Sequence, residues 1–144
     1  MKSILIIFSA LFFCSCSIEE KQYSRQKCIK NISTHSLELT ILGYSLNDTV
    51  THQVLNPEES TIEYTQVGSI NEIMGFGDIG SKIIIRFLDN NKGYICDSEH
   101  TGNLCFISKG SPFDTRNPED YNIQNNLYTY NITQEDYENA HVLP

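Results

Sequence analysis

Tryptophan is absent from the sequence, and basic residues are few. Tryptophan is the ring that proteins use most often to stack against sugars, so its absence weakens the case for a sugar-stacking surface. The 10 lysines and arginines are outnumbered by 18 acidic residues, which gives a formal net charge of −8. A nucleic-acid-binding protein needs basic side chains to displace phosphate counterions, so this balance argues against a nucleic-acid partner.

No apolar run is long enough for a permanent transmembrane helix. The run Ile4–Phe13 follows Lys2 and is interrupted only by Ser9. As a helix this run would span about 15 Å, which is about half of the hydrocarbon core of a bilayer. A positive residue before a short apolar run is typical of a secretory signal peptide. We therefore expect residues 1–15 to be a signal peptide that is removed.

The run ends in Phe13-Cys14-Ser15-Cys16, which resembles the lipobox of bacterial lipoproteins. That pattern has an apolar residue, two further residues of which the last is small, and a cysteine that receives the lipid. Ser15 meets the small-residue requirement before Cys16, whereas the bulky Phe13 precedes Cys14. The resemblance implies that Cys16 carries a diacylglycerol thioether. The acyl chains would hold the protein in the outer membrane of a Gram-negative envelope, on its periplasmic face or at the cell surface. Simple secretion, with a structural Cys16, is the alternative.

Residues 16–27 are polar and lack periodicity, which predicts a flexible lipidated tether. Glu19 and Glu20 resemble an acidic signal by which some Gram-negative phyla export lipoproteins to the cell surface, and an ordinary charged linker is the alternative. The remaining residues, 28–144, are long enough for a single domain with a sizeable core.

Three cysteines, Cys28, Cys96 and Cys105, lie after the tether. A location outside the cytoplasm permits disulfides between them. Cys96 and Cys105 lie at the two ends of CDSEHTGNLC, a plausible hairpin, and they are the first candidate pair. This pairing leaves Cys28 free, and a bond from Cys28 to either of the others stays open. The same segment contains acidic residues and a histidine, but the second ligand pair typical of a zinc site is missing, so we expect no metal.

Short β-type runs separated by turn residues occupy most of the chain after residue 28. They lie at 37–41, 50–54, 61–67, 82–88, 94–96, 103–108 and 127–132. This pattern predicts an all-β domain, an antiparallel β-sandwich of immunoglobulin-like, Greek-key type, with a small closed barrel as the alternative. We expect an extended surface loop over 109–126. Thr133, with Asp136 three residues later, predicts a short capped helix over 133–140.

The closing segment YTYNITQEDYENA (128–140) resembles the C-terminal pattern of small uncharacterised bacterial lipoproteins. The pattern is a Tyr-rich strand followed by Thr-x-x-Asp-Tyr-x-x-Ala. The resemblance implies the class and location already inferred, and it assigns no activity. Tyr128 and Tyr130 share one face of that strand, and we interpret them as a half-buried core face.

GFGDIG (75–80) has the G-x-G-x-x-G spacing of loops that bind nucleotide phosphates. In dinucleotide-binding folds the motif follows a strand and opens a helix whose N-terminus binds the pyrophosphate. Here a β-branched run, 82–88, follows the motif, and no βαβ unit surrounds it. We therefore expect an inter-strand loop, with neither a nucleotide nor another cofactor.

Catalytic motifs are also missing. No Ser, His and acid form a recognisable pattern, and the acidic pairs lie in turns as chain neighbours. We expect a non-enzymatic module that binds or scaffolds an envelope protein or an extracellular glycan through loops 68–81 and 109–126. A small envelope hydrolase, or an inhibitor of one, is the alternative. Asp48-Thr49-Val50 also resembles an O-glycosylation sequon of some Gram-negative secreted proteins, which marks Thr49 as a candidate for modification.

Overall fold

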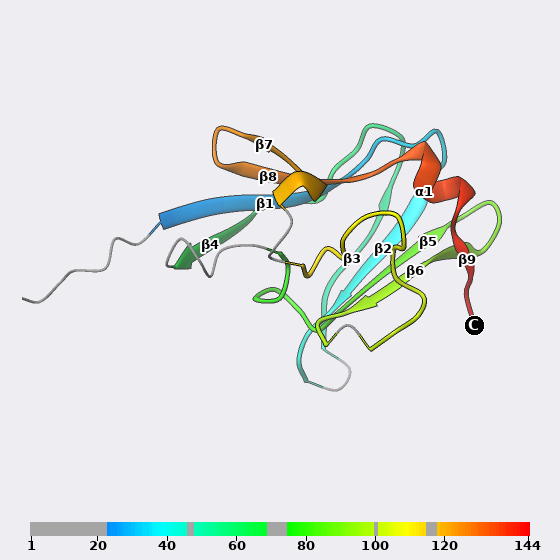
Figure 1. Ribbon diagram of the computed structural model, residues 1–144, viewed down its shortest axis with the longest axis horizontal. Coiled ribbons are helices and arrows are strands. Elements are labelled where there is room, and N and C mark those ends of the chain that lie inside the picture. The colour runs from blue at the N-terminus through cyan, green and yellow to red at the C-terminus, as the bar shows by residue number, and fades with distance from the viewer. Residues whose placement is uncertain (1–22, 46–47, 69–74, 100, 115–117) are drawn as a thin grey trace, which may run out of the picture.

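The computed structural model describes residues 23–45, 48–68, 75–99, 101–114 and 118–144, and it folds them into two β-sheets (Figure 1). The first sheet contains, in spatial order, β4 (Tyr64–Gly68), β1 (Tyr23–Asn31), β8 (Leu127–Ile132) and β7 (Tyr121–Gln124). The second contains β3 (Thr49–Leu55), β2 (Leu37–Leu42), β5 (Lys82–Phe87), β6 (Lys92–Asp97) and β9 (His141–Val142). A 3-10 turn, η1 (Pro118–Asp120), precedes β7, and the helix α1 (Gln134–Glu138) lies between β8 and β9. The predicted mostly-β, sandwich-like fold with a short C-terminal helix is confirmed.

One strand pair differs from the fully antiparallel architecture that we predicted. β1 and β8 run parallel, with Ile29 opposite Tyr130, whereas the other pairs of the described strands are antiparallel. A parallel pair needs a long crossover connection, and residues 32–126 lie between these two strands. The two sheets show a sandwich-like architecture, and the immunoglobulin-like, Greek-key connection stays a prediction.

The core lies where the two sheets face each other, and it follows from the alternation of apolar residues along the strands. β2 and β5 pair so that Leu39 lies opposite Ile85, and both side chains are fully buried. Ile29 and Tyr130 of the first sheet belong to the same buried cluster. Side chains on successive strand residues point to opposite faces, so this period-2 pattern places one apolar face of each sheet against the other.

The folded part begins at Tyr23, within the segment that we predicted to be tether. β1 includes Lys27, of which only 1% is exposed. The Lys27 ammonium donates to the side chain of Gln66 and the carbonyl of Gly75, and its Nζ lies 3.0 Å from an Asp78 carboxylate oxygen. Burial lowers the pKa of Lys27, and the contact with Asp78 opposes that shift. A buried cation is tolerated when it is paired and hydrogen-bonded. These contacts therefore allow Lys27 to be buried within a strand of this polar segment.

Three further expectations about secondary structure were wrong. Residues 103–108 form no strand, although the Leu104 carbonyl accepts a hydrogen bond from the Ile95 amide at 2.9 Å. Residues 109–126 are not one loop, because η1 and β7 lie inside that range. The predicted strand at 61–67 begins only at Tyr64, and Ile62 is 68% exposed.

The predicted N-cap of the C-terminal helix is confirmed, and a tight turn joins β5 to β6. Thr133 is the N-cap of α1, and its hydroxyl accepts from the Asp136 amide while the Asp136 carboxylate accepts from the Thr133 amide. The β5–β6 turn places Asn91 at φ 56°, a conformation that asparagine tolerates. Among the described residues, none of the helices has the length and apolar character needed to cross a membrane.

Candidate functional site

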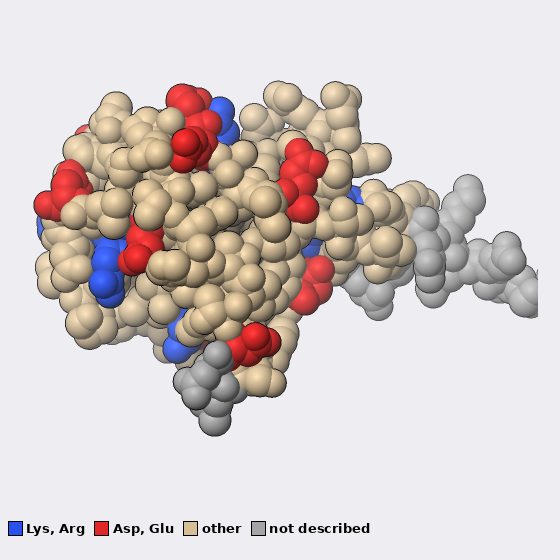
Figure 2. Space-filling model, turned by 180° about the vertical axis from the view of Figure 1, so that it is seen from behind, with Lys and Arg blue, Asp and Glu red and all other residues tan. Residues whose placement is uncertain are grey.

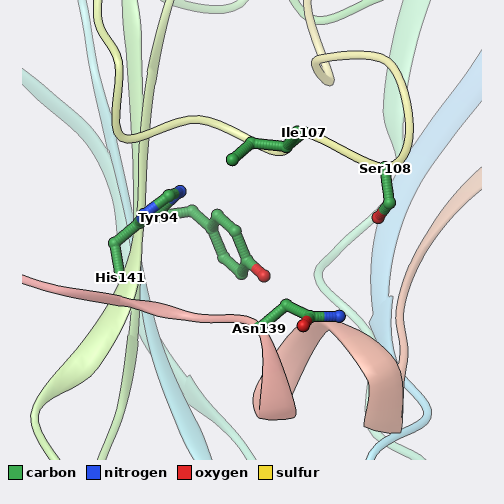
Figure 3. A pocket seen from close by; sticks show the side chains of 5 residues that line it. All are labelled: Tyr94, Ile107, Ser108, Asn139 and His141. Atoms are coloured by element: carbon green, nitrogen blue, oxygen red, sulfur yellow. The ribbon is translucent and has the colours of Figure 1, made fainter.

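A pocket of about 290 Å³ opens where β6, β9, the end of α1 and the segment 104–110 meet (Figure 3). Figure 3 shows the Tyr94 side chain between the 104–110 segment on one side and the helix end on the other. The side chains that line the pocket are those of Tyr94, Ile107, Ser108, Asn139 and His141.

Tyr94 forms the base of the pocket and is held by three aromatic or polar contacts. Its ring stacks on Phe106 with the ring centroids 3.9 Å apart, and the edge-on His141 ring lies 5.6 Å away. Its hydroxyl donates to the main-chain carbonyl of Asp136 at 2.7 Å. Burial, together with the nearby Asp136 charge, raises the pKa of Tyr94 to about 12. The phenol therefore stays neutral at physiological pH, and its oxygen keeps a lone pair that can accept a hydrogen bond.

One wall of the pocket is the segment 104–110, and a disulfide fixes where it begins. Cys96 and Cys105 are bonded, with their Cα atoms 4.7 Å apart, and Cys28 is a free, buried cysteine. The ring nitrogen Nε2 of His141 lies 3.1 Å from the Cys105 carbonyl oxygen. These contacts tie the start of the wall to β6 and to β9.

An ion pair between the partly buried Lys109 and the buried Asp136 fixes the far end of the same wall. Lys109 Nζ lies 2.5 Å from the Asp136 carboxylate, donates to the Asn131 carbonyl at 2.6 Å, and sits 4.4 Å and 4.5 Å from the ring centroids of Phe106 and Tyr130. Burial lowers the pKa of Lys109, and the Asp136 charge opposes this shift. Because Asp136 also completes the capping box of α1, the pair joins the wall to the N-terminus of the helix.

The lining offers polar groups beside one apolar side chain. A hydroxyl, an amide, a phenol and an imidazole are present, and among the described residues neither a carboxylate nor a lysine or arginine lines the pocket. Ile107 is 86% exposed, so its side chain is available for apolar contact with a ligand. In the part of the chain that the structure describes, no group of three or more metal-binding side chains is suitably placed for an ion.

A histidine–aspartate contact lies elsewhere, on the surface. His35 Nδ1 is 2.7 Å from the Asp89 carboxylate, the Tyr137 hydroxyl donates to the same carboxylate at 2.9 Å, and the rings of His35 and Tyr137 stack at 3.5 Å. A nucleophilic triad also needs a hydroxyl or thiol at the second ring nitrogen. Among the hydrogen bonds of the described residues, none supplies it. The contact links the β5–β6 turn to α1 and to the segment that contains His35.

The loops and motifs singled out in the sequence do not form this pocket. In the GFGDIG loop Phe76 is fully buried, Asp78 contacts Lys27, and a strand follows rather than a helix. Residues 69–74 and 115–117 of the two expected binding loops lie outside the described residues, and the rest of those loops contributes no lining side chain.

Other candidate residues lie in varied surroundings. Thr49 is exposed at the start of β3, as a modification site must be. Tyr130 is fully buried and Tyr128 partly buried, in line with their interpretation as core. Cys16 lies outside the described residues.

Sequence reasoning missed the pocket because its lining comes from separate elements. Only the contacts that hold the walls of the pocket in place have local signals in the sequence. These signals are the capping spacing of Thr133 and Asp136 and the cysteine pair. No protein-family model, no curated protein and no solved structure matches the chain.

Proposed function

We propose that the protein is a lipid-anchored, non-enzymatic binding module of the bacterial envelope, and that the pocket over Tyr94 holds a neutral polar ligand, such as one sugar residue of a glycan. The lipid anchor is inferred from the lipobox-like sequence that ends at Cys16. The observation that carries the ligand class is the lining, which combines hydrogen-bonding groups with an exposed apolar side chain.

The pocket groups suit a sugar in kind and in number. The Ser108 hydroxyl and the Asn139 amide both donate and accept, as sugar hydroxyls do, and Ile107 offers a surface for the C–H face of a pyranose ring. Ligand sites in proteins are commonly apolar hollows with a few well-placed polar groups. The net charge of −8 disfavours an anionic ligand.

The position of the pocket also supports a binding role at the end of a tether. In Figure 1 the described chain enters the first sheet at one end of the molecule, whereas α1, β9 and the C-terminus lie at the other. A domain anchored before Tyr23 would therefore carry the pocket on the side away from its anchor. Binding residues placed on a rigid scaffold in this way are typical of recognition modules.

Titration of the full mature protein with neutral oligosaccharides of glucose, galactose, mannose or N-acetylglucosamine tests the ligand class. Losing one hydrogen bond costs about 1 kcal/mol, so Ser108→Ala and Asn139→Ala should each weaken binding about fivefold. Asn122→Ala, which removes an exposed amide on β7, is the matched control and should leave affinity unchanged.

Two outcomes would contradict the proposal. Equal losses in Asn139→Ala and Asn122→Ala would show that the pocket is not the binding site. Turnover of an oligosaccharide that His141→Ala abolishes would favour the envelope hydrolase. The anchor is tested separately by the mass of the N-terminal peptide, which should carry diacylglycerol on Cys16 and lose it in Cys16→Ser.

A further inference from the structure

We infer that the weakly charged end of the first sheet, where β1 begins, docks on the surface of the lipid bilayer and thereby turns the pocket outward. The inference rests on the proposed lipid tether at Cys16, and it adds an orientation to that tether. For brevity we call this surface the docking end. It consists of Tyr23–Gln26 with β4, β7 and the start of β8.

The docking end has very little charge for a protein of this composition. β4, β7 and β8 contain no charged residue, and the first four residues of β1 contain only Arg25, although 19% of the whole sequence is charged. In Figure 2 the end of the molecule next to the grey N-terminal segment is mostly tan, while most of the red side chains lie over the remainder. Anionic lipids attract cations and repel acidic surfaces, so this end approaches a bilayer most easily.

Exposed apolar side chains lie on the same strands. Tyr23 is 40% exposed, Val67 60% and Ile123 45%. Val67 lies opposite Ser24, so its side chain is on the other face of the first sheet from those of Tyr23 and Ile123, and the two faces meet at the end where β1 begins. The Arg25 guanidinium lies 4.9 Å from the centroid of the Tyr128 ring. Tyrosine and arginine both combine an apolar body with a polar tip, which suits the boundary between headgroups and acyl chains.

The length of the tether brings this end to the membrane. Only residues 17–22 separate Cys16 from Tyr23, and a fully extended chain of that length spans at most about 25 Å. The lipid anchor therefore keeps the docking end close to the bilayer at all times. Three apolar side chains would bind a membrane weakly in a free protein. In the anchored protein the same contact is intramolecular, and its effective concentration is in about the millimolar range.

Fluorescence of the full-length lipidated protein in vesicles of phosphatidylethanolamine with phosphatidylglycerol tests the orientation. Val67→Cys and Val142→Cys each receive the environment-sensitive fluorophore NBD, and the unsubstituted protein, whose free Cys28 is buried, is the labelling blank. Val142 is exposed on β9, at the end away from the tether. Interfacial side chains sit about 5–10 Å into the boundary region. We therefore expect blue-shifted emission and quenching by quencher-bearing lipid at 67, and aqueous emission at 142.

Position 67 is near the anchor in any orientation, so a second pair of variants separates contact from proximity. Ile123→Asp adds a charge to the docking end and should return the emission at 67 toward its aqueous value. Val54→Asp adds the same charge to an exposed position of β3, in the second sheet, and should leave the emission unchanged.

Three results would overturn the docking. They are aqueous emission at position 67, equal emission at 67 and 142, or equal effects of Ile123→Asp and Val54→Asp. If the N-terminal peptide carries no diacylglycerol, the proposed tether fails and the orientation fails with it. Lipid on Cys16 combined with aqueous emission at 67 refutes the orientation alone.

Discussion

Replacing Asp136 by asparagine should destabilise the fold by about 3 kcal/mol, because it leaves the ammonium of Lys109 without its counter-ion. Removing one partner of a buried ion pair costs about 3–5 kcal/mol. The low end applies here, since Lys109 keeps its hydrogen bond to the Asn131 carbonyl and is 17% exposed. Asparagine is almost isosteric and retains an acceptor oxygen for Thr133, so the helix cap contributes little to this loss.

Lys109→Met removes the cation and keeps most of the aliphatic stem. The Asp136 carboxylate still accepts from the Thr133 amide at 2.7 Å and the Thr133 hydroxyl at 3.0 Å. It is therefore not left unsatisfied, and we expect a loss of about 1–2 kcal/mol, typical of a charge-assisted hydrogen bond.

The double variant, Asp136→Asn with Lys109→Met, has no unpaired charge. Its loss should be about 2 kcal/mol, well below the sum of the two single losses, because contacting residues are coupled. Urea unfolding followed by circular dichroism, with an unchanged slope m, measures all three variants. Additive losses would show that Lys109 and Asp136 do not interact, and a loss below about 1 kcal/mol for Asp136→Asn would refute the burial argument.

Three further predictions concern the scaffold. Gly93→Ala should destabilise the protein severely, because a Cβ there would lie 1.8 Å from the Ile85 carbonyl oxygen. At Gly77 a Cβ would meet no atom within 4 Å, so Gly77→Ala should change the free energy of unfolding by less than about 0.5 kcal/mol in the same urea titration. Replacing Cys96 and Cys105 together by alanine should lower the free energy of unfolding by about 2–3 kcal/mol, measured by thermal or urea unfolding. This is the loop-closure entropy that a disulfide removes from the unfolded chain at a sequence separation of 9, and an unchanged stability would contradict that explanation. The pKa of Tyr94 is raised to about 12, so the folded state keeps a proton that the unfolded state loses near pH 10. The stability from this tyrosine is therefore present below pH 10 and lost between about pH 10 and 12, and phenolate absorbance should rise together with loss of the β-sheet circular dichroism signal.

The parts of the fold that sequence reasoning predicted are those with local causes. Alternating apolar residues place β2 and β5 correctly, and the capping box sets the start of α1 at Thr133. β1 was missed because its first residues look like a solvated linker. Lys27 pairs with Tyr64 and Tyr128 of the neighbouring strands, and its ammonium is satisfied by Gln66, Gly75 and Asp78, so all of these partners lie at least 37 positions away in the sequence.

The opposite error occurred at residues 103–108, which have a strand-like composition and form no strand. Here the nearby disulfide and one hydrogen bond, from the Ile95 amide to the Leu104 carbonyl, hold an irregular segment beside β6. A covalent link to the neighbouring strand replaces a continuous ladder of main-chain hydrogen bonds. The chain after Cys105 is thereby free to leave the sheet and to form the wall of the pocket.

Substitutions in the frame of the pocket and substitutions in its lining are therefore expected to have different effects. The frame consists of the Cys96–Cys105 bond and the Lys109–Asp136 pair, whose members are buried or partly buried and bonded to their surroundings, so a change there is expected to cost folding free energy. The lining residue Ile107 is exposed, and its aliphatic side chain forms neither a hydrogen bond nor an ion pair. A substitution of Ile107 is therefore expected to leave stability within about 0.5 kcal/mol of the original, while it changes the apolar contact offered to a ligand. If both expectations hold, the fold specifies where the pocket lies, and the exposed lining residues determine which ligand it accepts.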